Sequence, residues 1–251
     1  MIESKDNEKL KLVRKLRERK HREREGLFAT EGEDLLAAGL AAGAEPRFVL
    51  VAAGAGIPDG DLSVDVVDQE LLAAASSLGS GTRAIAVWPL SWTPDPEAPC
   101  VYLHAVGDPG NVGAIVRTAD ALLGATVALG PGCADPFGPK ATRASMGSIF
   151  ARPPARVEVG ATPTPRAALV AHGGEGLGAL VGAATLCLGA EREGLPDEVL
   201  AACEVTATIP LQGAAESLNV AAAAAIACER LAAQAGARIS SLAMSKERPN
   251  A

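Results

Sequence analysis

Residues 209–230 read IPLQGAAESLNVAAAAAIACER and join the end of an apolar run to an alanine-rich segment through a polar loop. The apolar run, residues 205–211, predicts a buried strand, and the polar residues after it predict a turn. Because alanine has a high helix propensity, a final helix is predicted over 217–235, with Ser217 as its N-cap. Taken by itself, the stretch indicates only a capped and closely packed helix.

Two segments upstream also place polar residues directly after an apolar strand. The first, GDPGNVGAIVRTADALLGA (107–125), opens a helix near Asn111 and carries Arg117 six residues later. The second, CLGAEREGLPDEV (187–199), surrounds Glu191 with glycines, which leave backbone groups accessible to a planar ligand. Each segment alone also fits a structural role, with Asn111 as an N-cap and Arg117 as a surface ion-pair partner.

Strands alternate with helices along most of the chain, which predicts an α/β fold with a mostly parallel sheet and helices on both faces. Ligands of such sheets bind at loops beyond the carboxyl ends of the strands, where these three segments fall. Four prolines in residues 89–99 predict an interdomain linker. The predicted organisation is a basic helix with a small α/β domain over 1–88, this linker, and a second domain over 100–251.

The individual elements follow from apolar periodicity and from helix-stop residues. In the first domain, the patterns predict a continuous helix up to Glu25, a strand and a helix ending near Gly43, a strand at 47–54, a helix at 68–81 and a strand at 82–90. In the second domain, they predict strands at 100–106, 126–130, 156–159, 167–171, 185–189 and 205–211, with helices at 115–125 and 141–148 before the final helix.

The net charge of −7 counts against a nucleic-acid partner, but the charge is unevenly distributed. Residues 1–25 contain ten Lys or Arg against six Asp or Glu, a local charge of +4. Such a basic arm can supply phosphate contacts, although a solvated helix face of mixed charge fits it equally well.

The chain shows no sign of a secreted, membrane or metal-binding protein. Its first twenty residues lack the apolar core of a signal peptide, and its longest uncharged apolar run, 221–228, is too short to cross a bilayer. The five cysteines are scattered without C-x-x-C pairs and the three histidines are isolated, so neither disulfides nor a metal site are predicted. These features predict a cytoplasmic protein with reduced thiols and no metal.

Taken together and in order, the three loops resemble the motifs of the SpoU (TrmH) family in the SPOUT methyltransferase superfamily. The family's N-x-G-x-x-x-R-T-A is matched by Asn111, Gly113, Arg117, Thr118 and Ala119. Its L-G-x-E-x-x-G-L is matched by Leu188, Gly189, Glu191, Gly194 and Leu195. Its I-P-x-x-G-x-x-x-S-L-N-V is matched by Ile209, Pro210, Gly213, Ser217, Leu218, Asn219 and Val220. KATRASMGSIF, residues 140–150, also resembles the family's K-x-x-R-A-S-x-G block.

A second, weaker similarity covers residues 10–88. The segment RKHREREGLFATEGEDLLAAGL places Arg22, Phe28, Glu31 and Gly32 on an R…F…EG pattern. This pattern resembles the L30e-like RNA-binding domain that precedes the methyltransferase domain in many family members. The similarity implies an RNA substrate, with the basic arm selecting which RNA is bound.

The resemblance implies a trefoil-knotted SPOUT domain that binds S-adenosylmethionine and methylates a ribose 2'-hydroxyl of structured RNA. It assigns cofactor binding to Gly189, Glu191, Ile209, Pro210 and Leu218. It assigns the chemistry to Arg117, as organiser or activator of the ribose hydroxyl, with Asn111, Glu191, Ser217 and Asn219. The role of Arg117 as base or as electrostatic clamp stays open, because a guanidinium with its high pKa is a poor base by itself. It also implies a homodimer, because the arginine of this family works across the subunit interface, and no metal.

Several alternatives stay open. Ribosomal RNA is favoured over transfer RNA as the substrate by family analogy alone. A non-catalytic RNA-binding protein that keeps the fold is a second reading, although every motif position is intact. A nicotinamide-dependent oxidoreductase is disfavoured, because no G-x-G-x-x-G lies between a strand and a helix. The P-loop and nucleophile-elbow patterns are absent as well.

Overall fold

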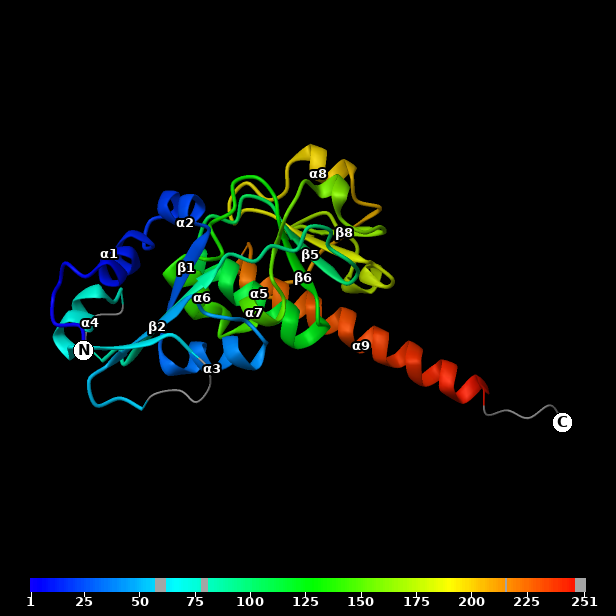
Figure 1. Ribbon diagram of the computed structural model, residues 1–251. Helices are drawn as coiled ribbons and strands as arrows, with labels where there is room; N and C mark the ends of the chain where they lie inside the picture. The colour runs from blue at the N-terminus through cyan, green and yellow to red at the C-terminus, as the bar shows by residue number, and fades with distance from the viewer. Residues whose placement is uncertain (57–61, 78–80, 215, 247–251) are drawn as a thin grey trace.

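The structure, a computed structural model, describes residues 1–56, 62–77, 81–214 and 216–246, with side chains described up to residue 233. Two β-sheets lie side by side, and the last helix extends away from the body of the molecule (Figure 1). Each sheet carries its own helices.

The first sheet has four strands in the order β1-β4-β2-β3. Strand β4 pairs antiparallel with both β1 and β2, while β2 and β3 are parallel. The strands are β1 (Leu27–Glu31), β2 (Phe48–Ala52), β3 (Val64–Val67) and β4 (Ala84–Pro89), and the helices are α1 (Glu8–Lys15), α2 (Arg19–Glu25), α3 (Glu33–Ala41) and α4 (Gln69–Ala75). The small α/β unit is therefore confirmed, whereas β3 has no counterpart among the predicted elements.

The predicted continuous N-terminal helix is wrong, because the chain breaks between α1 and α2. Side chains satisfy the carbonyl groups that this break exposes: Arg22 Nη1 donates to Leu16 O at 2.7 Å and to Arg17 O at 2.8 Å. Helix α4 ends at Ala75 instead of reaching residue 81, and Arg17 donates to the carbonyls of Ala75 and Ser76 there. Residues 78–80 of that prediction lie outside the described residues. Propensity patterns do not foresee such side-chain caps.

Most cations of the basic arm contact another group of the protein. Eight of its ten cations have a hydrogen-bond or ion-pair partner, and Lys5 and Lys15 are the two without one among the described residues. The pairs join, for example, Arg19 to Glu23 and Arg24 to Glu25 on the same helix. The local charge of +4 therefore overstates how many cations of the arm face solvent unpaired.

The second sheet has six strands, all parallel, in the order β10-β8-β9-β5-β6-β7. They are β5 (Cys100–Leu103), β6 (Thr126–Leu129), β7 (Ala155–Arg156), β8 (Arg166–Leu169), β9 (Thr185–Leu188) and β10 (Val205–Ala207). All six strands were predicted, and each observed strand is shorter than its predicted range. Because the strands are parallel, the loops that follow β5, β9 and β10 leave the sheet at the same edge.

The helices of this half are α5 (Pro109–Leu123), α6 (Pro139–Ser145), α7 (Ser148–Ala151), α8 (Asp197–Ala201) and α9 (Val220–Lys246), with short 3₁₀ turns at Val159–Ala161 and Leu177–Leu180. The helix predicted over 141–148 is divided, because Met146 and Gly147 adopt φ of 49° and 97°. Helix α8 lies in a segment predicted as loop. Helix α9 begins later than predicted and runs on to Lys246.

Apolar side chains cover both faces of the six-stranded sheet. One face carries Val101, Leu103 and Leu186 against α5 and α9, and the other carries Tyr102 and Cys187 against Leu195 and Val199 near α8. The predicted arrangement of helices on both faces of a parallel sheet is thereby confirmed. None of the helices in the described ranges is long and apolar enough to span a membrane.

A set of contacts, called the joint below, connects the two halves of the molecule; most of it is buried, and the Arg143–Asp34 pair lies at its exposed rim. Its members are Arg22, Phe28, Asp34 and Ala38 from the first half and Asp135, Phe137, Arg143, Gly147 and Phe150 from the second. The Phe28 ring lies 4.9 Å from that of Phe137 and 5.7 Å from that of Phe150. Arg143 Nη1 donates to both carboxylate oxygens of Asp34, at 2.8 and 2.7 Å. The R…F…EG pattern and the K-x-x-R-A-S-x-G block therefore meet in the joint.

The segment 89–99, predicted as a linker, runs between the two sheets and is held against the second. Thr93 donates through its backbone N–H to Pro154 O at 2.8 Å and through its hydroxyl to Pro153 O at 2.7 Å. Trp92 packs edge-on against Phe137, with 4.9 Å between ring centroids. This connection is therefore packed in place rather than a free spacer.

Candidate functional site

Three loops that are far apart in sequence meet at the carboxyl edge of the six-stranded sheet. They follow β5, β9 and β10, and β5 and β9 are direct neighbours in the sheet. Each loop contributes one polar side chain to a shared network: Asn111, Glu191 and Asn219. Asn111 Nδ2 donates to Glu191 Oε1, while Asn219 Nδ2 donates to Asn111 Oδ1 at 3.1 Å and to Glu191 Oε1 at 3.4 Å. The predicted convergence of the three motifs is visible in these contacts.

Asn219 also caps the last helix. Its Oδ1 accepts from the backbone N–H groups of Ala221 at 2.9 Å and Ala222 at 3.3 Å. The prediction that Ser217 is the N-cap is therefore wrong, because the helix begins at Val220 and Asn219 holds the cap position. A single amide thus uses its oxygen for the helix and its nitrogen for the network.

Asn111 lies inside α5 rather than at its cap. Asp108 is the N-cap, and its carboxylate accepts from the Asn111 backbone N–H at 3.0 Å. Lys140, from the K-x-x-R-A-S-x-G block, donates to the other oxygen of Asp108 at 2.7 Å and, with the backbone N–H of Asn111, lowers the pKa of this carboxyl. The charged Asp108 cap therefore fixes the first turn of α5, from which the Asn111 side chain projects.

The loop after β9 closes on itself as a tight turn. Ala190 and Gly194 exchange backbone hydrogen bonds of 3.1 and 3.0 Å, and Gly194 has a φ of 69°. A Cβ on Gly189 would lie 2.2 Å from the carbonyl carbon of Gly194, so a side chain there has no room. These two glycines are required by the turn that presents Glu191.

A pocket of about 350 Å³ lies beside this network, within the size range of small-molecule sites. Of the residues predicted to bind a cofactor, Gly189, Glu191, Ile209 and Leu218 line it, whereas Pro210 is exposed and does not. Ser217, which was predicted to take part in the chemistry, lines the pocket too. The remaining walls are mostly apolar, from Leu169, Leu188, Leu195, Leu211, Val170 and Val220.

The pocket also offers unpaired main-chain donors. Among the described residues, the backbone N–H groups of Ile209, Leu211 and Leu218 have no hydrogen-bond acceptor. Apolar walls with free amides at the rim suit a flat, nitrogen-rich ring. The pocket therefore fits a nucleoside-like cofactor.

A second hollow, of about 280 Å³, lies on the other side of Glu191. It is lined by the loop Ala105–Asp108 and by Ala190–Glu193, so Glu191 belongs to both cavities. Among the described residues, Glu191 Oε2 has no hydrogen-bond donor. The loop that carries Glu191 therefore lines both an apolar pocket and a second hollow, an arrangement that suits a site for two substrates.

Family models match this chain over both halves. The model of the SpoU rRNA methylase family matches residues 98–229, more than half of the chain. The chain belongs to the SpoU rRNA methylase family. A model of an MRM3-like substrate binding domain matches residues 7–80. The predicted family and enzyme class are thereby confirmed.

Relatives of the SpoU family extend this match over nearly the whole chain. A Bacillus subtilis (strain 168) protein named 23S rRNA (guanosine(2553)-2'-O)-methyltransferase RlmP is 34% identical over 242 residues, covering 90% of this chain and 96% of its own. A solved structure of an AdoMet-bound rRNA methyltransferase from Sinorhizobium meliloti superposes with a TM-score of 0.80 at 27% identity, covering 91% of this chain and 95% of that one. The SpoU methyltransferase AviRb from Streptomyces viridochromogenes shares the fold, with a TM-score of 0.82 at 24% identity over 92% of this chain and 98% of that chain.

Arg117, the arginine of the first SpoU motif, lies apart from the network. It is exposed on α5 and makes no hydrogen bond or ion pair with any residue that the structure describes. Six residues beyond Asn111, it is rotated by about 120° around the helix and displaced by about 9 Å along it. Within one chain, the structure therefore brings together Asn111, Glu191 and Asn219 but not Arg117.

Sequence reasoning missed several residues at the site. Leu169, Val170 and His172 line the pocket because β8 is the neighbour of β9, although no polar motif follows β8. Asp108 lies in the motif segment 107–125 and Lys140 in the segment 140–150, but neither was predicted to have a role. The D-P pair before Asn111 was an available signal, because aspartate followed by proline is a common N-cap and first-turn sequence.

All five cysteines are free, and burial raises the pKa of Cys100 and of Cys228 to about 12. In the ranges that the structure describes, no group of three or more His, Cys, Asp or Glu could hold a metal ion.

Proposed function

We propose that this protein transfers a methyl group from S-adenosylmethionine to a ribose 2'-hydroxyl of 23S ribosomal RNA. The observation that carries the proposal is the Asn111–Glu191–Asn219 network, in which Glu191 lines both the apolar pocket and the hollow. The pocket would hold the cofactor, with Leu169, Ile209 and Leu218 among the apolar residues against it, and the hollow would take the acceptor nucleotide. When bound, the cofactor supplies an electrophilic methyl group on a sulfonium.

The chain's residues position the acceptor rather than form a covalent bond. Methyl transfer to an oxygen is an in-line displacement, so the main contribution of the protein is to align the hydroxyl and assist loss of its proton. Asn111 and Asn219 hold Glu191 Oε1, which leaves Oε2 free to accept a hydrogen bond at the boundary of the two cavities. Ser217, which is exposed at the pocket wall, completes this set.

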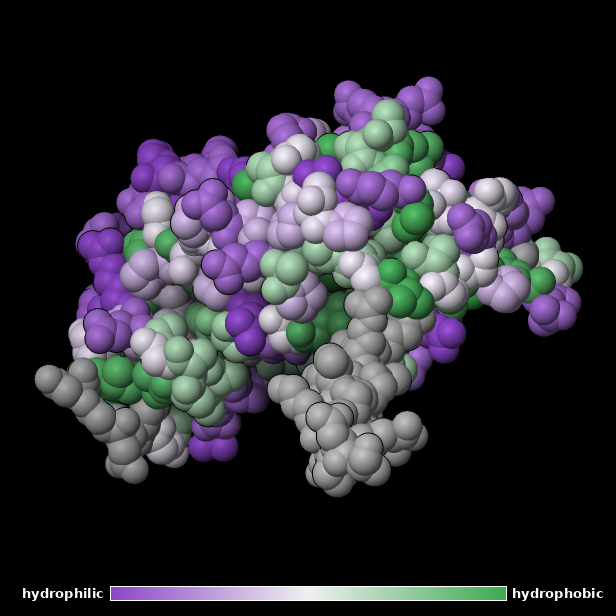
Figure 2. All heavy atoms as spheres, turned by 90° about the vertical axis from the view of Figure 1, so that its right-hand side faces the viewer, coloured by the Kyte–Doolittle hydropathy of each residue, from purple (hydrophilic) through white to green (hydrophobic). Residues whose placement is uncertain are grey.

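Arg117 organises the ribose hydroxyl in the site of a second copy of the chain. Its exposure and its lack of a partner among the described residues leave the guanidinium available for this role. Apolar side chains are exposed on the same two helices, with Leu122 on α5 at 41% and Ile226 on α9 at 39%. Figure 2 shows hydrophobic side chains gathered beside the start of the grey C-terminal segment. A homodimer across α5 and α9 would cover these residues.

The relative from Bacillus subtilis, which is named as a 23S rRNA methyltransferase, supports ribosomal over transfer RNA. The match of residues 7–80 to a substrate binding domain supports a role of the first half in holding that RNA. The proposal also includes three further features: a trefoil knot in the second half, a domain division at 89–99, and a cytoplasmic location.

The test is transfer of a labelled methyl group from S-adenosylmethionine to unmodified 23S rRNA and transfer RNA transcripts, followed by mapping of the modified ribose. We expect a single ribose methyl on the 23S transcript. The position equivalent to the guanosine named for the Bacillus subtilis relative is the first to map. Cofactor binding without methylation of any RNA would support the non-catalytic alternative instead.

The role of Arg117 is tested by mixing subunits. Arg117→Ala and Asn219→Asp should each abolish turnover, whereas Arg47→Ala, an exposed arginine on the first sheet, should not. If the arginine acts across the dimer, mixing the two inactive variants restores about a quarter of the wild-type activity, because half of the dimers regain one complete site. No recovery on mixing would place Arg117 in its own subunit's site.

A further inference from the structure

A groove of about 520 Å³ lies outside the site described above, between α2 and the loops that follow β6 and β7. Arg19 lines one wall, Arg156 and Glu158 line another, and the backbone of residues 130–136 forms the floor. It is called the Arg19–Arg156 groove below. None of the family motifs contributes to it.

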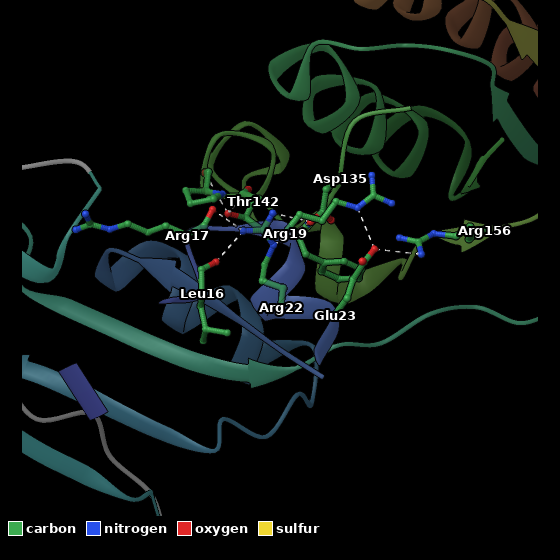
Figure 3. Close-up of polar contacts among 11 residues, drawn as sticks. Leu16, Arg17, Arg19, Arg22, Glu23, Asp135, Thr142 and Arg156 are labelled. Carbon is green, nitrogen blue, oxygen red and sulfur yellow. Dashed lines mark hydrogen bonds and ion pairs between the residues drawn. The ribbon is translucent and has the colours of Figure 1, made fainter. Parts of the chain in front are cut away.

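Two arginines face each other across this groove through one carboxylate. Arg19 Nε donates to Glu23 Oε1 at 2.9 Å, and Arg156 Nη1 lies 3.5 Å from the same oxygen (Figure 3). Both guanidinium groups come from side chains that are 49% exposed, and that of Arg156 stacks on the Trp92 ring at 4.4 Å from its centroid. The hydrogen bond from Arg19 lowers the pKa of Glu23, so the carboxylate is charged at neutral pH. Two cations thus share one exposed anion.

The joint holds the floor of the groove in place, because Asp135 belongs to both. Arg22 donates to Asp135 Oδ2 through Nε at 2.9 Å and through Nη2 at 2.6 Å, and only 5% and 11% of the two side chains are exposed (Figure 3). This buried pair is therefore not available to a ligand. In the floor itself, the backbone N–H groups of Gly132 and Cys133 have no acceptor among the described residues. Free cationic and amide donors are the groups that bind phosphate oxygens.

The groove lies next to the hollow assigned to the acceptor nucleotide, and backbone hydrogen bonds connect the two linings. Ala105 N–H donates to Pro131 O at 2.8 Å, and Ala134 N–H donates to Val106 O at 2.9 Å. Ala105 and Val106 line the hollow, and Pro131 and Ala134 line the groove. One layer of backbone therefore separates the two cavities, which makes the groove a neighbour of the hollow.

We propose that the Arg19–Arg156 groove binds an RNA phosphodiester next to the methylated nucleotide, with both guanidinium groups exchanging Glu23 for the phosphate. The inference rests on the proposed function, because it requires the acceptor ribose in the adjoining hollow. A phosphate accepts from two arginines more strongly than a single shared carboxylate oxygen, because it offers several charged oxygens. Glu23 then acts as an internal competitor that keeps the arginines apart from other anions.

The experiment measures binding and methylation of an unmodified 23S rRNA transcript by the full-length protein. Arg19→Gln and Arg156→Gln remove one guanidinium each, and Arg83→Gln is the matched control. The Arg83 side chain is 54% exposed, and its Nε lies 3.6 Å from Glu33 Oε1. Arg83 directly precedes β4, at the end of the first sheet that is far from α2. Each groove variant should weaken RNA affinity about tenfold, and the slope of log affinity against log salt should fall by about one. Affinity for S-adenosylmethionine and turnover at saturating RNA should not change.

Glu23→Gln provides the discriminating test. If Glu23 competes with the phosphate, removing its charge should tighten RNA binding about two- to threefold at physiological salt. Glu25→Gln is the matched control, since it removes the same charge from the same helix but pairs with Arg24. A purely structural role of Glu23 would instead weaken binding or leave it unchanged.

The outcomes separate this inference from the proposed function. If the wild-type protein methylates the transcript while the two groove variants behave like Arg83→Gln, the groove does not hold RNA and the function stands. If Glu23→Gln gives no gain over Glu25→Gln, the competitor role is wrong and with it the proposed exchange. If the wild-type protein neither binds nor methylates any RNA, the proposed function itself fails.

Discussion

The site network and the joint are both built from motif residues, but they differ in surroundings and partners. Asn111, Glu191 and Asn219 meet at the edge of the sheet, where Glu191 and Asn219 are exposed. Arg22 and Phe28 are buried, and their partners lie in the other sheet. The network residues meet at a solvent-facing edge of the sheet, where Asn219 also caps α9, whereas Arg22 and Phe28 join the two halves from buried positions. We therefore expect substitutions in the network to affect activity most, and substitutions of the buried joint residues to affect stability most.

The largest effect is expected in the joint. Arg22→Ala leaves the Asp135 carboxylate buried without its partner, so the free energy of unfolding should fall by about 3–5 kcal/mol. Denaturant unfolding measures this, and Arg24→Ala, an exposed neighbour, should cost less than about 1 kcal/mol. The double variant Arg22→Met with Asp135→Leu should recover only part of the loss, because the carbonyls of Leu16 and Arg17 stay without their Arg22 donor. A small loss in Arg22→Ala would show that the ion pair does not hold the sheets together.

At the network, we expect a large loss of activity with little loss of stability. Asn219→Asp keeps an N-cap oxygen for α9 but removes the Nδ2 donor to Asn111 and Glu191. Methyl transfer should fall by about 100-fold or more, with the free energy of unfolding within about 0.5 kcal/mol of wild type. Asn7→Asp makes the same exchange at the cap of α1 and should leave methylation unchanged. Comparable activity of Asn219→Asp and wild type would remove the network from the chemistry.

A third prediction concerns a motif residue that the structure places at a helix crossing. A Cβ on Gly113 would lie 2.2 Å from Ala141 O and 2.7 Å from the Cβ of Ala144, so Gly113→Ala forces α5 and α6 apart. We expect a destabilisation of about 1–2 kcal/mol after the gain in helix propensity is included. Gly160→Ala, where a Cβ meets nothing within 4 Å, is the control for the thermal unfolding measurement. If Gly113→Ala leaves thermal stability unchanged, close packing of α5 against α6 does not explain why the motif has glycine at this position.

The smallest effect is expected for Lys140→Gln. The Lys140–Asp108 pair is exposed, so stability at neutral pH should change by less than about 1 kcal/mol. Because Lys140 lowers the pKa of Asp108, the stabilisation from the charged cap is present at neutral pH and lost as the pH falls through that pKa. Without Lys140 this pKa rises, so the midpoint of acid unfolding should move to higher pH. An unchanged midpoint would mean that Lys140 does not support the cap.

Much of the second sheet could be predicted from sequence, because each parallel strand is a short apolar run bounded by glycine or proline. The convergence of the three motif loops also followed, since parallel strands end at one edge. The cap of α9 was misplaced, because serine and asparagine are almost equally good caps and only Asn219 has its oxygen over the first turn. The break after α1 was missed because it depends on Arg22, six residues away.

The contents of the joint and the groove were beyond sequence reasoning for a different reason. The basic arm and the R…F…EG pattern suggested RNA contacts, yet Arg22 pairs with Asp135, which lies 113 residues along the chain. Nothing in local composition indicates whether an arginine faces a carboxylate in another sheet or a phosphate in solvent. Only Arg19 of that arm lines the groove, and its partner arginine comes from the edge strand β7.

The joint fixes more than stability. With the two halves held by a buried ion pair and packed aromatic rings, the separation between the Arg19–Arg156 groove and the Asn111–Glu191–Asn219 network is fixed before RNA binds. The protein then selects an RNA by its shape. A transcript binds when its backbone bends so that a phosphate and a ribose are separated by the distance between the groove and the network. Selection among RNAs would then follow the shape of a folded loop, which many base sequences can share.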